Sequence, residues 1–171
     1  MDLAQMAGWL AAAAAAAIIA MLKKSDLRLK QGLIIHTVHY RIHFALLGLP
    51  TAVISCVIAL ARISLSIYTR SLLCAAVLII SVATALAVSR STVEILPLAA
   101  SVVLTLSLFR FDGIKLRLGL LAGAVLWLIH NIYVQSWGGI CLEACFCLST
   151  LWGLWTMVQE QNENSKKEVC L

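Results

Sequence analysis

Charged residues are scarce in this chain of 171 residues, since lysine, arginine, aspartate and glutamate together make up 12% of it while 62% is apolar. A typical soluble domain carries roughly 25% charged residues. The chain therefore has too little polar surface to cover a globule in water. This scarcity excludes a soluble protein and predicts an integral membrane protein whose main surroundings are the lipid bilayer.

Motifs for catalysis and for metal binding are missing as well. The six cysteines include no C-x-x-C pair, and most of them fall inside apolar runs, where cysteine behaves as a small apolar residue. Nucleophile elbows, phosphate-binding loops and metalloprotease motifs are absent. We therefore expect no enzyme, no cofactor, no structural disulfide and no zinc or iron–sulfur site.

The pattern of a transmembrane β-barrel is also absent, because the apolar runs do not alternate with polar residues. Backbone groups in lipid must be hydrogen-bonded within their own segment, which leaves α-helices. A bilayer core of about 30 Å needs roughly 17–25 apolar residues per helix. The sequence predicts an all-α bundle with seven transmembrane helices, at about 3–22, 32–48, 50–68, 72–89, 92–109, 118–135 and 138–158.

Basic residues indicate how these helices cross the membrane. They cluster after the first, third and fifth runs and in the tail, and positively charged short loops stay on the cytoplasmic side. The first run is preceded by Asp2 and followed by Lys23 and Lys24, the reverse of a signal peptide. We expect the N-terminus outside and the C-terminus in the cytoplasm. The excess of basic residues then requires no nucleic-acid partner.

An internal repeat appears when the chain is shifted by 87 residues against itself. His43 then aligns with His130, Gly32 with Gly119, and three basic positions coincide. Two three-helix units joined by one extra helix would give parallel repeats, a 3+1+3 arrangement. The predicted divisions are a first repeat at 1–70, a linker helix at 71–90, a second repeat at 91–158 and a polar, disordered cytoplasmic tail at 159–171.

Polar and aromatic residues at bilayer depth are the candidate binding residues. Ionisable groups there are costly unless they face the bundle interior, a partner or water. His36 and His39 lie on the same helical stripe as His43, nearer the cytoplasmic end. These two histidines either line the cavity or only hold helices together. An aromatic face with a hydrogen-bonding neighbour suits a sugar or similar solute. The residues expected to line a central cavity are Tyr40, His43, Trp127, His130 and Asn131.

Three further residues stand out inside the apolar runs. Glu143 is an acid within the last apolar run. It could bind the solute or a proton. Alternatively, it forms an ion pair with Arg41 or Arg62, or its side chain snorkels to the outer surface. Arg62 is expected to snorkel toward the cytoplasmic end. Pro97 removes a backbone hydrogen bond and could form a hinge, although packing explains it as well.

Three stretches resemble a known family: "RISLSIYTRS", "EILPLAASVVLTLSLFRFDGIKLR" and "WLIHNIYVQSWGGICLEACFCL". They are similar to the corresponding parts of the YgjV-type bacterial inner-membrane proteins, and the resemblance covers most of the chain. It implies a multi-pass protein of the bacterial inner membrane. More distantly, W-x-x-H-N resembles W-x-x-Y-x of the SWEET and PQ-loop carriers, which share the 3+1+3 arrangement.

The sequence thus favours a small-solute carrier that works by alternating access between two three-helix bundles. The alternative is a non-transporting inner-membrane partner or assembly protein, whose buried polar residues only fix helix packing. The solute, proton coupling and the formation of a homo-oligomer are left open.

Overall fold

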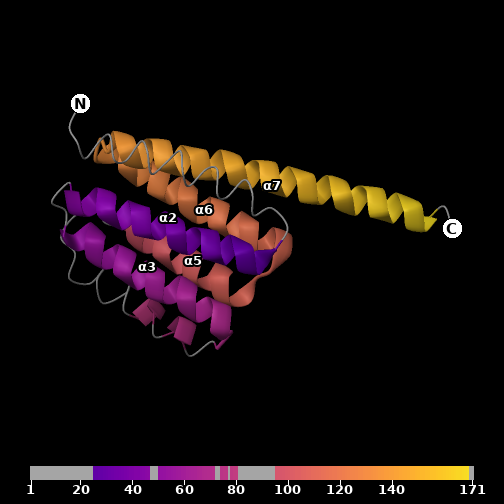
Figure 1. Cartoon of the computed structure of the whole chain (residues 1–171), viewed down its shortest axis with the longest axis horizontal. Helices are drawn as coiled ribbons and strands as arrows, with labels where there is room; N and C mark the ends of the chain where they lie inside the picture. The colour runs from indigo at the N-terminus through magenta and orange to yellow at the C-terminus, as the bar shows by residue number, and fades with distance from the viewer. Residues whose placement is uncertain (1–24, 47–49, 72–73, 77, 81–94, 170–171) are drawn as a thin grey trace.

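Five long α-helices account for most of the described chain. The computed structural model describes residues 25–46, 50–71, 74–76, 78–80 and 95–169. Within these ranges no strand occurs, so the predicted all-α class is confirmed for this part of the protein. The helices are α2 (Asp26–Leu46), α3 (Pro50–Tyr68), α5 (Ile95–Arg110), α6 (Gly113–Tyr133) and α7 (Trp137–Val169), arranged side by side in Figure 1.

The helix boundaries follow the apolar runs closely at α3 and differ at α2. Helix α3 occupies the predicted 50–68, whereas α2 begins at Asp26 rather than at about 32. Its extra first turns are held because Leu29 and Leu33 are buried in the core. The predicted run 3–22 lies outside the described residues. Of the run 72–89, the described residues 74–76 and 78–80 are helical.

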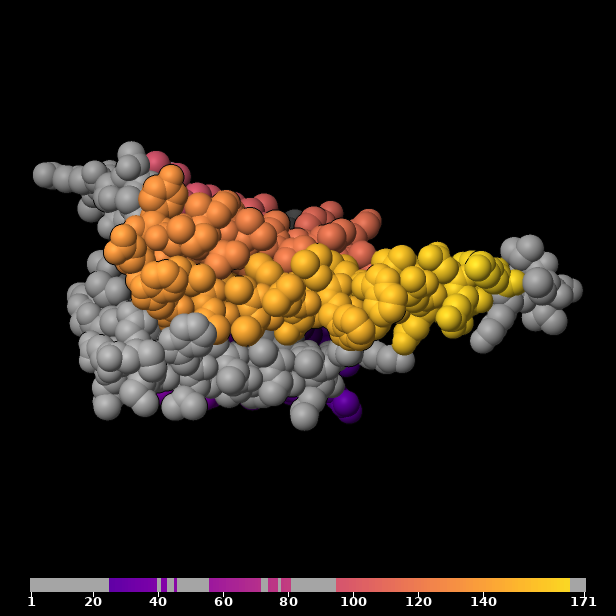
Figure 2. All heavy atoms as spheres, turned by 90° about the horizontal axis from the view of Figure 1, so that it is seen from above, coloured from indigo at the N-terminus to yellow at the C-terminus, as the bar shows by residue number. Residues whose placement is uncertain are grey.

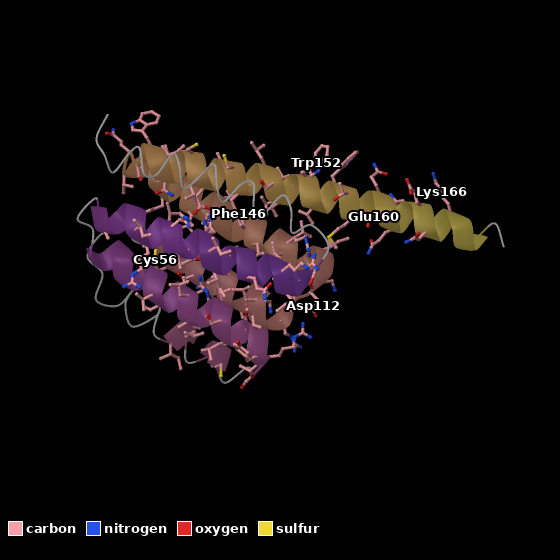
Figure 3. All side chains as sticks on the ribbon, in the orientation of Figure 1. Cys56, Asp112, Phe146, Trp152, Glu160 and Lys166 are labelled. Carbon is pink, nitrogen blue, oxygen red and sulfur yellow. The ribbon has the colours of Figure 1, made fainter. Side chains whose placement is uncertain are left out.

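Helix α7 is longer than predicted and projects beyond the other described helices (Figures 1 and 2). The prediction of a disordered tail at 159–171 is wrong up to Val169, because α7 continues to that residue. The segment consists of glutamine, glutamate, lysine and other residues without glycine or proline, which favours helix. Glu160 and Lys166 lie on its exposed, polar part (Figure 3).

The helices have the lengths and surfaces of a membrane bundle. By length and composition, 113–133 and 137–166 can each cross a membrane, and the shorter helices 56–68 and 95–110 are also apolar. The outer faces of α6 and α7 carry exposed apolar side chains such as Leu118, Ile132, Leu148 and Trp152. Such a surface fits lipid and does not fit water.

Each described helix packs on at least one other described helix. Helix α2 packs on α3, α5 on α6, α6 on α7, and α3 on α5. Close approach of α5 and α6 depends on two glycines: a Cβ at Gly119 would lie 1.9 Å from Ser107 Oγ, and one at Gly123 would lie 2.5 Å from a methyl group of Leu104. Small residues at these positions allow the two backbones to come together.

Polar contacts tie the helices together at the end of the bundle where α2 and α6 begin. Asp26 accepts hydrogen bonds from the Gly113 backbone N–H at 2.8 Å and from Arg117 Nη1 at 2.7 Å. Lys30 Nζ donates to the carbonyl oxygens of Ser66 at 2.8 Å and Leu108 at 3.2 Å. These contacts connect α2 to α3, α5 and α6. Arg70 and Asp112 form a separate ion pair, which is exposed.

The contacts of Asp26 predict how stability depends on pH. Burial alone would raise its pKa, but the hydrogen bonds from Gly113 and Arg117, with the charge of Arg117, outweigh burial and hold the pKa below its ordinary value of 3.8. The stabilisation from Asp26 is therefore complete above that value and is lost as the pH falls through the lower pKa of the folded state. We expect wild type to unfold at a higher temperature than Asp26→Asn near pH 7, with the difference shrinking at about pH 3. A difference that is constant across this range would contradict the assignment.

The helix bounds repeat at a fixed spacing. Helices α2 and α6 have 21 residues each, and both of their bounds are separated by 87 residues, the spacing of the predicted repeat. Helices α3 and α7 begin at Pro50 and Trp137, the same separation. The bounds of α2 and α6 and the first residues of α3 and α7 therefore follow one spacing, although α7, with 33 residues, is longer than α3, with 19.

Candidate functional site

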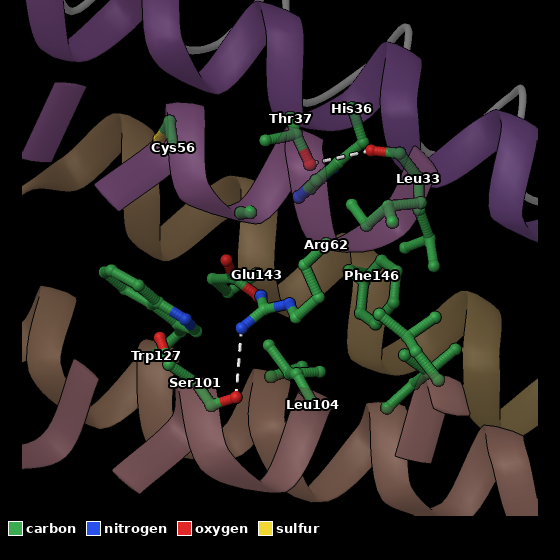
Figure 4. A pocket seen from close by; sticks show the side chains of 15 residues that line it. Leu33, His36, Thr37, Cys56, Arg62, Ser101, Leu104, Trp127, Glu143 and Phe146 are labelled. Carbon is green, nitrogen blue, oxygen red and sulfur yellow. Dashed lines mark hydrogen bonds between the residues drawn. The ribbon is translucent and has the colours of Figure 1, made fainter. Parts of the chain in front are cut away.

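A cavity of about 80 Å³ lies inside the bundle, at the level of Glu143 on α7 and Arg62 on α3 (Figure 4). All five described helices contribute to its wall. Much of the lining is apolar, including Leu104 and Phe146. Its polar or polarisable side chains are His36, Thr37, Cys56, Arg62, Ser101, Trp127 and Glu143.

Arg62 is buried in this cavity and only 4% exposed. Its Nη1 donates to the Ser101 carbonyl oxygen at 2.9 Å and to Thr105 Oγ1 at 3.3 Å, both on α5. Its Nε has no hydrogen-bond partner among the described residues. The prediction that Arg62 snorkels to the end of the bundle is wrong, because these bonds hold the guanidinium inside, against α5.

Glu143 reaches the same cavity from α7 and is likewise 4% exposed. Its burial contradicts the interpretation that it snorkels to the surface. The predicted ion pairs with Arg41 and Arg62 are not found among the contacts of the described residues, and Arg41 is exposed. Figure 4 shows Arg62 and Glu143 pointing into one space from different helices. The cavity thus contains an arginine and a glutamate side chain that do not form a direct ion pair.

The predicted residues of α6 separate in the structure. Trp127 lines the cavity and His130 does not, and their two rings stand edge to face with centroids 5.6 Å apart. Asn131 is fully buried and donates from Nδ2 to the Trp127 carbonyl oxygen at 2.9 Å. A Cβ at Gly139 would lie 2.4 Å from Asn131 Oδ1, so this amide sits in the contact between α6 and α7. Asn131 therefore packs helices and does not line the cavity.

The structure tests the remaining predicted residues, Tyr40, His43 and Pro97, only in part. Tyr40 and His43 lie in α2, and their side chains are outside the described ones, so their role stays a prediction. Pro97 lies near the beginning of the described part of α5, and residues 81–94 before it are outside the described ones. A hinge at Pro97 also stays a prediction.

Sequence reasoning missed several residues of the cavity wall. His36 was placed on a stripe with His43 but was not among the residues expected to line the cavity. It is buried, and the centroid of its ring lies 5.5 Å from that of Phe146. Cys56 and Ser101 drew no prediction as ligands. The signal for Cys56 was present, because it aligns with Glu143 at the 87-residue spacing. No group of three potential metal ligands occurs in the parts of the chain that the structure describes.

An apolar helical bundle that encloses a few buried polar side chains is typical of a multi-helix membrane protein. The chain belongs to the family of bacterial inner membrane proteins called Imp-YgjV, whose model matches residues 2–161. It is 30% identical over 132 residues to "Inner membrane protein YgjV" of Escherichia coli (strain K12), which covers 77% of this chain and 72% of that relative. No solved structure matches the chain. The predicted family and the location in the bacterial inner membrane are confirmed.

Proposed function

We propose that the protein is a small-solute carrier of the inner membrane, working by alternating access between two three-helix units joined by one helix. The observation that carries the proposal is the composition of the cavity wall. Four pairs of lining residues are separated by the repeat spacing of 87: Leu33 and Leu120, Thr37 and Ala124, Cys56 and Glu143, and Ala59 and Phe146. The cavity lies between equivalent surfaces of the two units, where carriers built from repeats bind their solute.

The matching bounds of α2 and α6 support the same 3+1+3 arrangement. So does the contact between their first residues, since Asp26 accepts a hydrogen bond from Gly113, which lies 87 residues further along. Equivalent helix ends that meet in this way are what a pseudo-two-fold axis along the membrane normal produces. The likeness to SWEET carriers belongs to this proposal and depends on this arrangement.

The polar contacts at one end of the bundle fit a closed gate. With the orientation indicated by the basic loops, Asp26, Lys30 and Arg117 lie at the cytoplasmic end. Asp26 joins α2 of one unit to α6 of the other, and Lys30 also bonds to both units, through Ser66 and Leu108. In alternating access these bonds between units break when the cytoplasmic side opens.

Transport by the reconstituted protein tests this proposal. Proteoliposomes are assayed by counterflow with labelled amino acids, sugars, polyols and nucleosides. Trp127→Ala, in the cavity wall, is expected to lower the flux by about tenfold or more, because it removes a large aromatic contact to solute. The matched control is Trp152→Ala on the exposed face of α7, which should retain the flux. Absence of flux for every solute, or equal loss in both variants, would overturn the proposal.

One observation favours a second candidate, a non-transporting partner or assembly protein. Arg62 bonds to α5, and Asn131 sits in the contact between α6 and α7, so both act in helix packing. In that case water-soluble thiol reagents should fail to reach Cys56 in membranes, since the cavity would stay closed. Reaction at Cys56 would favour the carrier.

A further inference from the structure

We propose that the cavity binds a small zwitterion, with Arg62 holding its carboxylate and Glu143 holding its cationic group. The inference rests on the proposed carrier for its biological use, while the binding itself is a separate property of the cavity. The solute class would be the smallest amino acids and molecules of the same charge pattern.

The first argument is the state of the Arg62 guanidinium. Nη1 supplies both of its hydrogen bonds, to Ser101 and Thr105. This leaves the edge formed by Nε and Nη2 without a hydrogen bond to any described residue, and Nε is fully buried. Two parallel N–H groups on one edge of arginine match the two oxygens of a carboxylate. A buried charge in this state lacks an anion, and a carboxylate would supply it.

The second argument is the position of Glu143. Its carboxylate is buried, reaches the same cavity from another helix, and makes no hydrogen bond or ion pair with a described residue. Arg62 and Glu143 belong to different repeat units, on α3 and α7. A molecule with an anionic and a cationic end would bridge them. A bound zwitterion would therefore also join the two units, which suits a solute that must couple to their movement.

The third argument is size and lining. The cavity of about 80 Å³ is several times larger than the about 10–15 Å³ that one water requires, so it has room for a small polar molecule. Glycine and L-alanine are the smallest amino acids, and a monosaccharide is larger than either. Leu33, Leu104 and Phe146 in the wall offer no hydrogen bond to the hydroxyl groups of a sugar, although Thr37 and Ser101 also line the cavity. This cavity therefore favours a small zwitterion over the sugar expected from the sequence.

Binding to the full-length protein in lipid nanodiscs tests the inference directly. Glycine, L-alanine, acetate, methylammonium and glucose are titrated by calorimetry. Glycine or L-alanine should bind at least about tenfold more tightly than acetate or methylammonium, because each of the latter satisfies one charge and leaves the other unpaired. Glucose should not bind. Equal binding of glycine and acetate, or binding of glucose alone, would overturn the inference.

Two neutralising variants assign the roles. Glu143→Gln should lose the preference for the zwitterion and bind acetate at least as well as glycine, since the cationic end has lost its partner. Arg62→Gln should lose affinity for both glycine and acetate. Matched controls are Glu160→Gln and Arg41→Gln, which change exposed residues and should bind as wild type does. If acetate binding survives Arg62→Gln in a folded protein, the carboxylate site is elsewhere.

Because Arg62 also holds α5, a readout without substitution is needed. Cys56 lines the cavity, so mass spectrometry of wild-type protein can follow its alkylation by a small thiol reagent. Glycine should slow the reaction at Cys56 and leave that at Cys74, outside the cavity lining, unchanged. No protection together with no binding overturns the inference.

These experiments distinguish a failure of the zwitterion site from a failure of the proposed carrier. Binding and protection by glycine without flux of any solute would support the zwitterion site and refute the carrier. Flux of sugars that glycine does not inhibit would support the carrier and refute the zwitterion site.

Discussion

Replacing Asp26 by alanine is expected to lower the free energy of unfolding by about 3 kcal/mol. The change leaves Arg117 charged and without its carboxylate partner, although the Arg117 side chain is only 4% exposed. It also removes the acceptor for the first N–H of α6, at the positive end of that helix dipole. Breaking one side of a buried ion pair costs more than the pair contributes, because the remaining charge stays buried.

Reversible unfolding in mixed detergent micelles measures this effect. The matched control is Asp112→Ala, which breaks an ion pair whose side chains are both 58% exposed, and it should stay within about 1 kcal/mol of wild type. Adding Arg117→Met to Asp26→Ala should recover part of the loss, because the buried charge is then gone. Equal effects of the two aspartate changes would show that the contact with Arg117 contributes little.

Replacing Gly119 by alanine is expected to destabilise the protein by about 1–3 kcal/mol. The added Cβ would lie 2.6 Å from the Ser107 Cβ as well as against its hydroxyl group, so rotation of the serine side chain cannot relieve the clash. Helices α5 and α6 would have to move apart. The cost is set by overpacking of a close helix contact.

A compensating change gives this prediction a sharp test. Ser107→Gly removes the Cβ that the new alanine meets, so Ser107→Gly with Gly119→Ala should be more stable than the sum of the single changes indicates. Gly153→Ala on α7 is the control, since nothing lies within 4 Å of its added Cβ. Additive effects of the two changes would contradict the contact between α5 and α6.

The apolar runs were sufficient to predict α3 closely and the C-terminal ends of α5 and α6 within two residues, because a bilayer fixes both the composition and the length of a helix. Helix α6 begins at Gly113, about five residues before the predicted start. The start of α2 was missed for a physical reason. Asp26 and Lys30 look like loop residues by composition, yet their partners are Arg117, Ser66 and Leu108, which are distant in sequence. Contacts of that kind leave no local signal.

The candidate site was predicted in part. Trp127 and Glu143 were found because a large aromatic and an acid are unusual in apolar helices, and both line the cavity. Arg62 was predicted to snorkel because it lies close to the end of its helix in the sequence. Its side chain instead donates hydrogen bonds to α5, at the Ser101 carbonyl oxygen and Thr105 Oγ1. Asn131 shares a helical stripe with Trp127, but close approach at Gly139 turns it toward α7. Side-chain direction depends on the neighbouring helix as well as on helical spacing.

The polar C-terminal part of α7 separates any domain fused after Val169 from the apolar part of the helix. From Gln159 to Val169 the helix runs eleven residues, which at about 1.5 Å per residue is about 16 Å. A fluorescent protein or affinity tag joined after this helix would be separated by about that length from the apolar part of α7. The polar end of α7 therefore acts as a rigid spacer, and a fusion at this position offers a way to label the protein without blocking the end of the bundle.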